Sequence, residues 1–291
     1  MNYPHLQLTP ASPALGAFVE NIDLGQTLDD AVLAELLRAH ADYGVLFFRD
    51  QQLTPSQHIA LAEQLGEINV NRFFAAVDDH PQIAEVRKEP DQALNIGGGW
   101  HTDHSYDQIP ALGSLLYARE LPPAGGDTLY ASMYAAFEAL SDGMKQMLEG
   151  LNAVHSSRHV FGAAANRPAD LSDRLGNAEA ATQDAVHPVV LSHPRSGRKA
   201  LYVNPGFTVR FDGWTELESE PVLKFLYQHA ARPEFTYRFQ WAPGSLAFWD
   251  NRATWHFAVN DYQGERRLLH RITLEGERLV DAPPREAARG G

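Results

Sequence analysis

The sequence predicts a mainly β fold, a sandwich or barrel of short strands with helices packed outside it. Apolar, aromatic and β-branched residues form short runs, and turn sequences such as PAGGD, PRSG, APGS and DYQGE separate these runs. This alternation of short strands and tight turns is typical of sheet sandwiches and barrels. The expected strands are residues 44–49, 82–88, 113–120, 127–132, 151–157, 185–193, 199–204, 235–241, 245–251 and 266–276.

Four segments carry helix signals and are expected to cover the sheets. Residues 28–40 place their apolar side chains on one stripe of an amphipathic helix. Residues 54–66 begin with a T-x-x-Q capping box, have proline at the first helical position and end at a glycine. Residues 132–140 and 215–230 are further candidates.

The sequence predicts one domain over residues 1–280, followed by a frayed tail over residues 281–291. No internal repeat and no long linker divides it. Residues 162–185 are polar and rich in small side chains. A structureless stretch of that length inside a compact domain is typical of a functional lid, so we expect it to close over an active site.

Composition excludes several classes of protein. The chain has 291 residues, 37 acidic against 24 basic side chains, and a net charge of -13, which disfavours nucleic-acid and membrane-surface binding. It has no cysteine, which excludes disulfides, Cys-based zinc sites, iron–sulfur clusters and thiol nucleophiles. Because no secretory leader and no long apolar run is evident, a cytoplasmic location is expected.

The strongest local signal is the stretch NIGGGWHTDHSY, in which a His-x-Asp triplet follows three glycines. On a strand, residues two positions apart point the same way, so His101 and Asp103 can reach one metal ion. A second triplet, His40 and Asp42, lies at the end of the first predicted helix. There a histidine is favoured by the helix dipole alone, so we interpret His40 as structural. For His101 and Asp103, a polar loop at a sheet edge is the alternative interpretation.

The best candidate for a third ligand is His256, in the strand-like run WDNRATWHFAVNDY. Two histidines and a carboxylate would form the ligand set of a non-haem Fe(II) oxygenase, which leaves coordination positions open. If NDYQGE forms an antiparallel hairpin, Arg267 lies alongside the His256 strand. Arg267, Leu269 and Arg271 alternate onto one face, and two buried arginines require an anion. Arg266 is interpreted as a solvated residue on the outer face.

The motifs together resemble the taurine dioxygenase family (TauD/TfdA-like) of Fe(II)/2-oxoglutarate-dependent dioxygenases, which includes alkylsulfatases and aryloxyalkanoate dioxygenases. The resemblance covers about residues 8–280. It rests on WHTD at 100–103, GGDT at 125–128, WDNR at 249–252, His256 and RRLLHR at 266–271, with FFRDQ at 47–51, HPVV at 187–190 and LYVNPGFT at 201–208.

This resemblance implies a double-stranded β-helix, a cupin-like jelly roll with helices packed outside, and the family's chemistry. Fe(II) would be bound by His101, Asp103 and His256. Arg267 would pair with the distal carboxylate of 2-oxoglutarate, and Thr128 would add a hydrogen bond there. With O2, the cosubstrate would yield succinate and CO2 as a substrate C–H bond is hydroxylated. Arg271 would lie nearer the iron, against the acidic group of the substrate or the inner carboxylate of the cosubstrate.

The substrate pocket implied by the resemblance departs from that of taurine-cleaving members. Its lining positions are Asn71, Phe74, Gly97, Trp100, Phe161 and Phe207. The positions of Asn71, Phe74 and Gly97 carry histidine, tyrosine and asparagine in those members. The pocket should therefore be larger and more apolar than one for taurine. His104 and Tyr106 also differ, and His104 either supports the ligands or is simply exposed.

We therefore expect an oxygenase that acts on a small organic anion other than taurine. Sulfonates or sulfate esters rank level with aryloxyalkanoates, and acids derived from amino acids or bearing a quaternary ammonium come third. A jelly-roll zinc or manganese hydrolase or isomerase, and a metal-binding module without catalysis, are the alternatives from other classes. The resemblance also implies a dimer or tetramer, and no nucleic-acid or membrane partner is expected.

Overall fold

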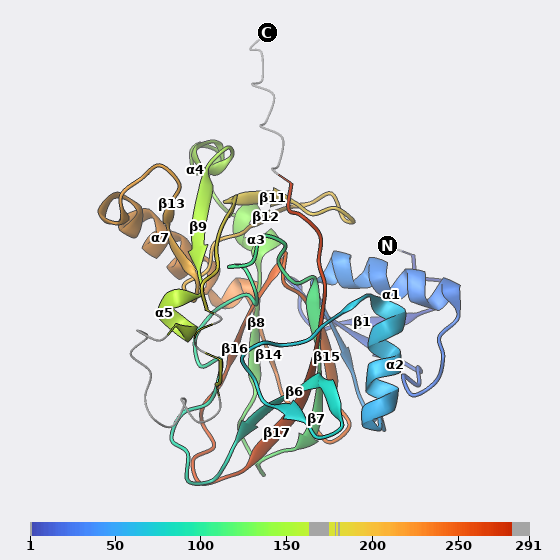
Figure 1. The fold of residues 1–291 in the computed structure, drawn as a ribbon. Helices are drawn as coiled ribbons and strands as arrows, with labels where there is room; N and C mark the ends of the chain where they lie inside the picture. Colours follow the sequence, from blue (N-terminus) through green and yellow to red (C-terminus); the bar gives the residue numbers. More distant parts are fainter. Residues whose placement is uncertain (1, 163–174, 178, 180, 281–291) are drawn as a thin grey trace.

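The computed structural model describes residues 2–162, 175–177, 179 and 181–280, and its largest sheet has nine strands (Figure 1). Most neighbouring strands in this sheet pair antiparallel, while β2 and β3 run parallel. In spatial order its strands are β1 (Gln7–Pro10), β2 (Ala17–Glu20), β3 (Val45–Phe48), β15 (Leu246–Asp250), β7 (Gly113–Glu120), β17 (Arg267–Leu274), β6 (His80–Lys88) and β5 (Ala76–Val77), and β4 (Ile68–Asn69) also pairs with β17.

A second sheet of three strands lies against the centre of the large one. It has the order β14 (Thr236–Phe239), β8 (Thr128–Ser132) and β16 (Thr254–Ala258). Tyr130 and Phe239 of this sheet share one buried cluster with Phe47, Trp249 and Leu269 of the large sheet. Two sheets that enclose a common core form the jelly roll that the sequence predicted.

Two helices cover the outer face of the large sheet, α1 (Asp30–Tyr43) and α2 (Pro55–Leu65) (Figure 1). Their apolar stripes share a cluster with side chains that point outward from the strands, such as Phe48, Phe248 and Ile272. Alternate residues of the central strands therefore enter two different cores, which explains why these strands are buried along their whole length.

The remaining elements form a second layer at the end of the jelly roll (Figure 1). Most of them contribute to a large apolar cluster around Trp255 and Phe211, whereas Phe161 of α5 (Arg158–Phe161) belongs to a separate cluster beside the cavity. These elements are α3 (Met133–Glu138), α4 (Asp142–Leu148), α5 (Arg158–Phe161), α7 (Glu216–Ala230), a short 3-10 helix (Pro233–Phe235), the sheet of β10 (Asp184–Pro188), β9 (Asn152–Ser156) and β13 (Thr208–Phe211), and the pair β11 (Val190–Ser192) and β12 (Lys199–Leu201).

Local sequence signals account for the helix ends. The Thr54 side chain accepts a hydrogen bond from the backbone amide of Gln57, and the Gln57 side chain accepts one from the backbone amide of Thr54, so the predicted capping box is confirmed. Thr215 caps α7 in the same way. The first helix extends past the predicted end at residue 40 to Tyr43, because the left-handed conformation that ends it occurs at Gly44, with φ of 74°.

The predicted hairpin between the His256 strand and the Arg267 strand is wrong. His256 in β16 pairs with Tyr130 of β8, in the three-stranded sheet. Both edges of β17 are occupied in the large sheet, by β6 and β7. The connection after β16 therefore crosses from one sheet to the other, so His256 and Arg267 lie in different sheets.

Two other strand predictions were too long. Residues 185–193 are divided into β10 and β11, with Val189 outside both strands, and the run 199–204 is a strand only to Leu201. The other expected strands are present, with ends shifted by about two residues or fewer, as is usual for such boundaries. In the part of the chain that the structure describes, no helix combines the length and the apolar character needed to cross a membrane.

Candidate active site

His101, Asp103 and His256 come together between the two sheets, as the sequence predicted. Each offers a ligand atom, and these atoms all lie within 4.8 Å of one another. Nε2 of His101 is 3.7 Å and Nε2 of His256 is 3.8 Å from the Asp103 carboxylate. They are the only such metal-binding group among the described residues. Two imidazoles and a carboxylate form a ligand set that suits a divalent first-row metal ion and leaves some of its coordination positions open.

Backbone pairing fixes the two histidines relative to each other. His101 lies outside the strands but forms an isolated antiparallel bridge with His256. The amide of His101 donates to the His256 carbonyl at 3.1 Å, and the amide of His256 donates to the His101 carbonyl at 2.8 Å. Nδ1 of His101 also lies 2.8 Å from the carbonyl oxygen of Gly99, which orients the ring so that Nε2 faces Asp103.

The electrostatics of the triad favour metal binding. Burial by itself raises the pKa of Asp103, but Arg271 and the neighbouring histidines outweigh it and hold this pKa well below its usual range. Burial, with His101 nearby, lowers the pKa of His256 to about 3. At neutral pH the site therefore offers a carboxylate and a neutral imidazole, the forms that coordinate a cation.

Arg267 is a buried cation that forms no ion pair with a carboxylate among the described residues. Its side chain lines the same cavity, and its Nε and Nη2 atoms are buried with no hydrogen-bond partner among the described residues. Burial lowers its pKa. A buried guanidinium with unsatisfied donors is unfavourable unless a ligand supplies the acceptors. A carboxylate matches its geometry.

Gly126 of the GGDT motif makes room for Arg267. Gly126 has φ of 69°, and a Cβ atom there would lie 3.0 Å from Cδ of Arg267. Thr128 lines the cavity beyond this turn, and its hydroxyl accepts a hydrogen bond from Nε1 of Trp241 at 3.0 Å. Arg267 and Thr128 thus both line the cavity, and their shared role at the cosubstrate stays a prediction.

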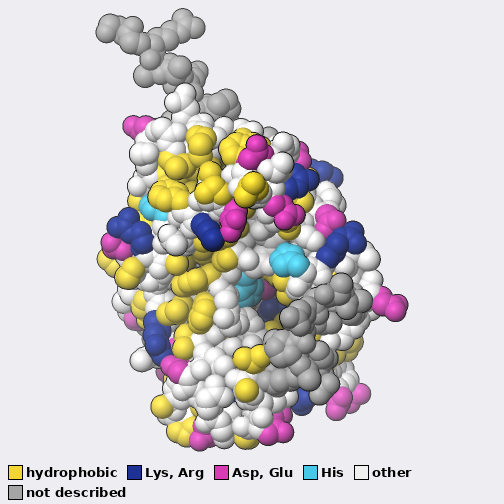
Figure 2. Space-filling model, turned by 90° about the vertical axis from the view of Figure 1, so that its left-hand side faces the viewer, with side chains coloured by type: hydrophobic (Ala, Val, Ile, Leu, Met, Phe, Trp, Pro, Cys, Tyr) yellow, Lys and Arg dark blue, Asp and Glu magenta, His cyan; other side chains and the backbone are white. Residues whose placement is uncertain are grey.

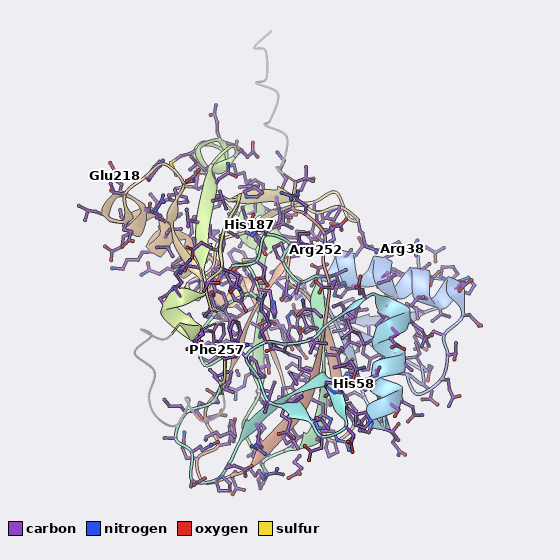
Figure 3. All side chains as sticks on the ribbon, viewed as in Figure 1. Arg38, His58, His187, Glu218, Arg252 and Phe257 are labelled. Atoms are coloured by element: carbon purple, nitrogen blue, oxygen red, sulfur yellow. The ribbon has the colours of Figure 1, made fainter. Side chains whose placement is uncertain are left out.

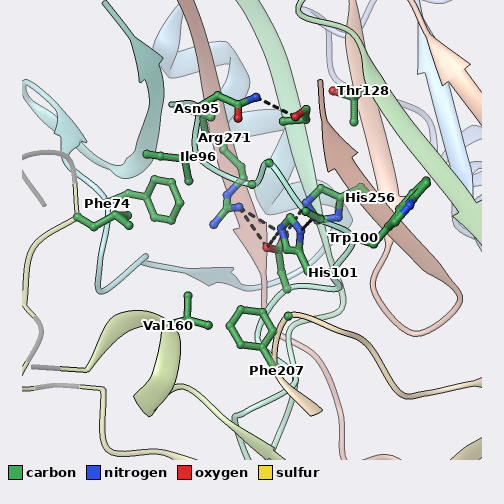
Figure 4. A pocket seen from close by; sticks show the side chains of 18 of the residues that line it. Phe74, Asn95, Ile96, Trp100, His101, Thr128, Val160, Phe207, His256 and Arg271 are labelled. Atoms are coloured by element: carbon green, nitrogen blue, oxygen red, sulfur yellow. Dashed lines mark hydrogen bonds and ion pairs between the residues drawn. The ribbon is translucent and has the colours of Figure 1, made fainter. Parts of the chain in front are cut away.

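Arg271 lies between the triad and the apolar wall (Figure 4). Its Nη1 atom is 3.4 Å from both oxygens of Asp103, and its guanidinium carbon is 4.7 Å from the ring centre of Phe74. Nε of Arg271 is buried with no partner among the described residues. Arg271 therefore has hydrogen-bonding capacity left beside the triad.

The cavity that connects these groups has a volume of about 640 Å³. Figure 2 shows it as a hollow in one face, with histidine and basic side chains inside. Every residue that the sequence assigned to the metal, cosubstrate and substrate lines it: Asn71, Phe74, Gly97, Trp100, His101, Asp103, Thr128, Phe161, Phe207, His256, Arg267 and Arg271.

The predicted substrate residues differ in what they offer to a ligand. Phe207 presents its ring to the cavity (Figure 4), whereas the Trp100 ring packs against Trp255 and Phe257. Oδ1 of Asn71 accepts hydrogen bonds from two backbone amides, so only its amide nitrogen is left for a substrate. Gly97 has φ of 78°, and a Cβ atom there would lie 3.2 Å from Cε1 of His101.

Several lining residues were not predicted, among them Ile96, Val160 and Gly206. The backbone at Gly206 passes so close to His101 that a Cβ atom added at Gly206 would lie 2.8 Å from the Cβ atom of His101. Such a contact between distant segments leaves no signal in a single sequence. The exposed interpretation of His104 is wrong, because the left-handed turn at this residue (φ 56°) leaves its side chain buried in the cavity wall.

His40 lies outside the triad, as predicted, but the helix dipole is a minor part of its environment. It is buried, stacks on Phe248 with ring centres 3.8 Å apart, and lies 3.5 Å from the Asp250 carboxylate. Of the predicted lid, residues 163–174, 178 and 180 lie outside the described residues. Within its described part, Leu175 pairs with Phe74 and lines the cavity, and closure stays a prediction.

Comparisons with known proteins show which family the chain resembles. The model of the family described as "Taurine catabolism dioxygenase TauD, TfdA family" matches residues 7–273. An alkylsulfatase of Acinetobacter baylyi is 35% identical, over 94% of this chain and 86% of its own. The alpha-ketoglutarate-dependent 2,4-dichlorophenoxyacetate dioxygenase of Cupriavidus pinatubonensis is 33% identical, over 93% and 98%. The crystal structure of a taurine dioxygenase from Burkholderia xenovorans superimposes with a TM-score of 0.80 at 36% identity, over 97% and 95%.

Proposed function

The chain belongs to the taurine catabolism dioxygenase family, TauD and TfdA, and on that premise we propose that it hydroxylates a C–H bond of a small organic anion. It is a 2-oxoglutarate-dependent dioxygenase that uses Fe(II), 2-oxoglutarate and O2. The buried Arg267 without an anion, in one cavity with the metal-binding triad, is the observation that carries this assignment.

The protein's part in the reaction is to hold and orient the reactants. Fe(II) and 2-oxoglutarate, when bound, supply an oxidative decarboxylation that yields succinate and CO2 and hydroxylates the substrate carbon. His101, Asp103 and His256 hold the metal, and Arg267 with Thr128 binds the distal carboxylate of 2-oxoglutarate. Arg271 has donors left for an acidic group beside the triad. A metal hydrolase or a metal-binding module would leave Arg267 without an anion, and neither is proposed.

The substrate we propose is an anion with alkyl or aryl bulk: a sulfate ester, a sulfonate or an aryloxyalkanoate. Phe74, Phe161, Leu175 and Phe207 give the cavity an apolar wall opposite the charged groups. Relatives named for alkyl sulfate and dichlorophenoxyacetate support the same classes. Taurine is a short zwitterion and would leave much of this wall unfilled. Acids derived from amino acids, or bearing a quaternary ammonium, rank behind these classes.

The fate of the product depends on the carbon that is hydroxylated. When that carbon also bears the sulfur or oxygen of the acidic or ether group, the hydroxylated product is unstable. It collapses to a carbonyl compound and releases sulfite, sulfate or a phenol. Because the three leaving groups differ, analysis of the products identifies the substrate class.

The test is the formation of succinate from 2-oxoglutarate with Fe(II), ascorbate and O2, across a panel of sulfonates, sulfate esters and aryloxyalkanoates. We expect slow succinate formation without substrate and a much faster rate with one class. His101→Ala is the control, and it should abolish both rates while the protein stays folded. No succinate with any compound, from protein that has bound iron, would overturn the proposal.

We also propose a homo-oligomer, dimer or tetramer, working in the cytoplasm. Both rest on the resemblance to the family. Light scattering coupled to size-exclusion chromatography tests the first, and cell fractionation tests the second.

A further inference from the structure

His104 is a buried histidine in the cavity wall with one ring nitrogen that nothing in the described protein satisfies. We propose that His104 is a substrate-contacting residue, held in place by Asp107 and Arg72, and that its Nε2 atom hydrogen-bonds an oxygen of the organic anion. This inference rests on the proposed function and identifies a specificity determinant of the same site. His104 follows Asp103 in the chain but does not belong to the metal-binding triad.

The two ring nitrogens of His104 have different environments. Nδ1 lies 3.1 Å from Oδ2 of Asp107. Nε2 is buried and has no hydrogen-bond partner among the described residues. His104 lines the cavity, whereas Asp107 does not. Nδ1 and Nε2 flank Cε1 of the imidazole, so Nε2 is the ring nitrogen that Asp107 leaves free in the cavity wall.

Asp107 is itself fixed from behind. Nη2 of Arg72 donates to both oxygens of the Asp107 carboxylate, at 2.8 Å each. The Tyr106 ring stacks on the His104 ring, with centres 5.6 Å apart and planes inclined by 26°. The imidazole is therefore held by a carboxylate on one edge and by an aromatic ring on one face. A ring restrained in this way keeps a fixed direction for its free nitrogen.

A ligand in the cavity could form a hydrogen bond with Nε2 of His104. Burying a polar atom without a partner is unfavourable, and an oxygen of a ligand in the cavity would complete the hydrogen bond of Nε2. The two arginines of the cavity have other partners: Arg267 is suited to the cosubstrate, and Arg271 already contacts Asp103. In sulfonates, sulfate esters and aryloxyalkanoates the polar atoms are oxygens, and an imidazole nitrogen beside the aromatic wall of Tyr106, Phe161 and Phe207 would fix their orientation.

Two substitutions separate a substrate contact from a structural role. In His104→Asn the amide occupies the position of Nδ1, so it keeps the bond to Asp107 and tolerates the left-handed backbone, but it cannot reach the cavity. In His104→Gln the amide occupies the position of Nε2, so it reaches the cavity but loses Asp107. A merely structural histidine would be replaced better by asparagine, and a substrate contact better by glutamine.

The experiment measures KM and kcat of wild type and both variants with hexyl sulfate, hexanesulfonate and phenoxyacetate, together with KM for 2-oxoglutarate and the unfolding midpoint. For the anion that wild type uses, we expect His104→Asn to raise KM by about tenfold, which corresponds to one lost hydrogen bond. We expect His104→Gln to raise it less, and KM for 2-oxoglutarate to stay unchanged in both. Calorimetric titration of the anion into enzyme with Fe(II) and 2-oxoglutarate, without O2, should give the same ranking.

The outcomes separate the two proposals. If wild type uses an anion and His104→Asn keeps its KM, the proposed function holds and the role of His104 is overturned. The same conclusion follows if only His104→Gln is impaired and it unfolds at a lower temperature, because that result marks a structural role. If wild type forms no succinate with any anion, the proposed function fails and this inference fails with it.

Discussion

Arg266 and Arg267 are consecutive in the chain but have different environments and different roles. Arg267 is buried and has unsatisfied donors, whereas Arg266 is partly exposed and pairs with Glu89 and Glu120 on the outside of the sheet. Side chains alternate along a strand, so consecutive arginines face the cavity and the solvent respectively. The pair therefore provides a test and its control.

Arg267→Gln should raise KM for 2-oxoglutarate at least tenfold, because about 1.5–3 kcal/mol of charge-assisted hydrogen bonding is lost. Arg267→Lys should be intermediate, since an ammonium keeps the charge but not the two-pronged geometry. Steady-state succinate formation at varied 2-oxoglutarate measures this. Arg266→Gln should leave that KM unchanged, and an equal rise in both variants would remove the cosubstrate role from Arg267.

Gly206 tests how tightly the metal ligands are packed. A Cβ atom at this residue would lie 2.8 Å from Cβ of His101, which forces one of them to move. We expect Gly206→Ala to weaken metal binding by about 10-fold or more with little loss of secondary structure, since misplaced ligands lose affinity before the fold is lost. Titration of the apoprotein with Mn(II), followed by calorimetry, measures the change.

Gly143, in α4, is the matched control for this substitution, because a Cβ atom added there would have nothing within 4 Å. Gly143→Ala should bind Mn(II) as wild type does and should be slightly more stable, because alanine favours a helix. Unchanged Mn(II) affinity in Gly206→Ala would show that the backbone at His101 is free to shift.

At the scale of the element, α2 carries a buried histidine onto the large sheet (Figure 3). Both ring nitrogens of His58 are buried without a partner among the described residues, and its ring meets Tyr117 of β7 edge to face. Burial, with smaller contributions from His270 and Arg119, lowers the pKa of His58 to about 3. In the unfolded chain a histidine has its ordinary pKa of about 6.5.

This difference makes stability depend on pH in a known direction. Because the unfolded state binds the proton more readily, stability is full above about pH 6.5 and is lost as the pH falls from there toward about 3. Between pH 7.5 and pH 5 the loss from His58 is about 2 kcal/mol. When urea unfolding is measured at the two pH values, the free energy of unfolding should fall by about 2 kcal/mol less in His58→Leu than in wild type. The control is His5→Leu at an exposed residue, which should show the same pH dependence of the free energy of unfolding as wild type. If His58→Leu loses as much stability as wild type between the two pH values, His58 is excluded as the cause of the dependence.

Elements whose signals are local could be predicted from the sequence, and those that depend on distant pairing could not. The ends of α2 followed from Thr54 and Gly66, because capping involves neighbouring residues. The hairpin before Arg267 was wrong because a turn sequence does not determine which sheet the next strand joins. The spacing of His101 and Asp103 indicated a metal site, but Gly206 and the buried ring of His104 are fixed only by tertiary contacts.

For the whole molecule, the cavity joins loops, two sheets and the second layer, so ligands should stabilise all of them together. Fe(II) and 2-oxoglutarate bind the folded state, and a ligand at 100 times its Kd adds about 2.7 kcal/mol. We expect the unfolding midpoint, measured without O2, to rise by several degrees with both ligands and by less with either alone. His101→Ala should show no rise with Fe(II), and an equal rise in that variant would place iron binding elsewhere.

The backbone bridge between His101 and His256 has a consequence for how the protein is made. A ribosome releases the chain from its N-terminal end, so His101 and Asp103 emerge long before β16 exists. Until then the His101 segment has no strand to pair with, and the growing chain offers an incomplete ligand set. β17, which carries Arg267 and lies between β7 and β6 in the large sheet, arrives later still. Iron loading thus belongs to the finished chain, and a product truncated before β16 has no competent centre at which iron and oxygen could react.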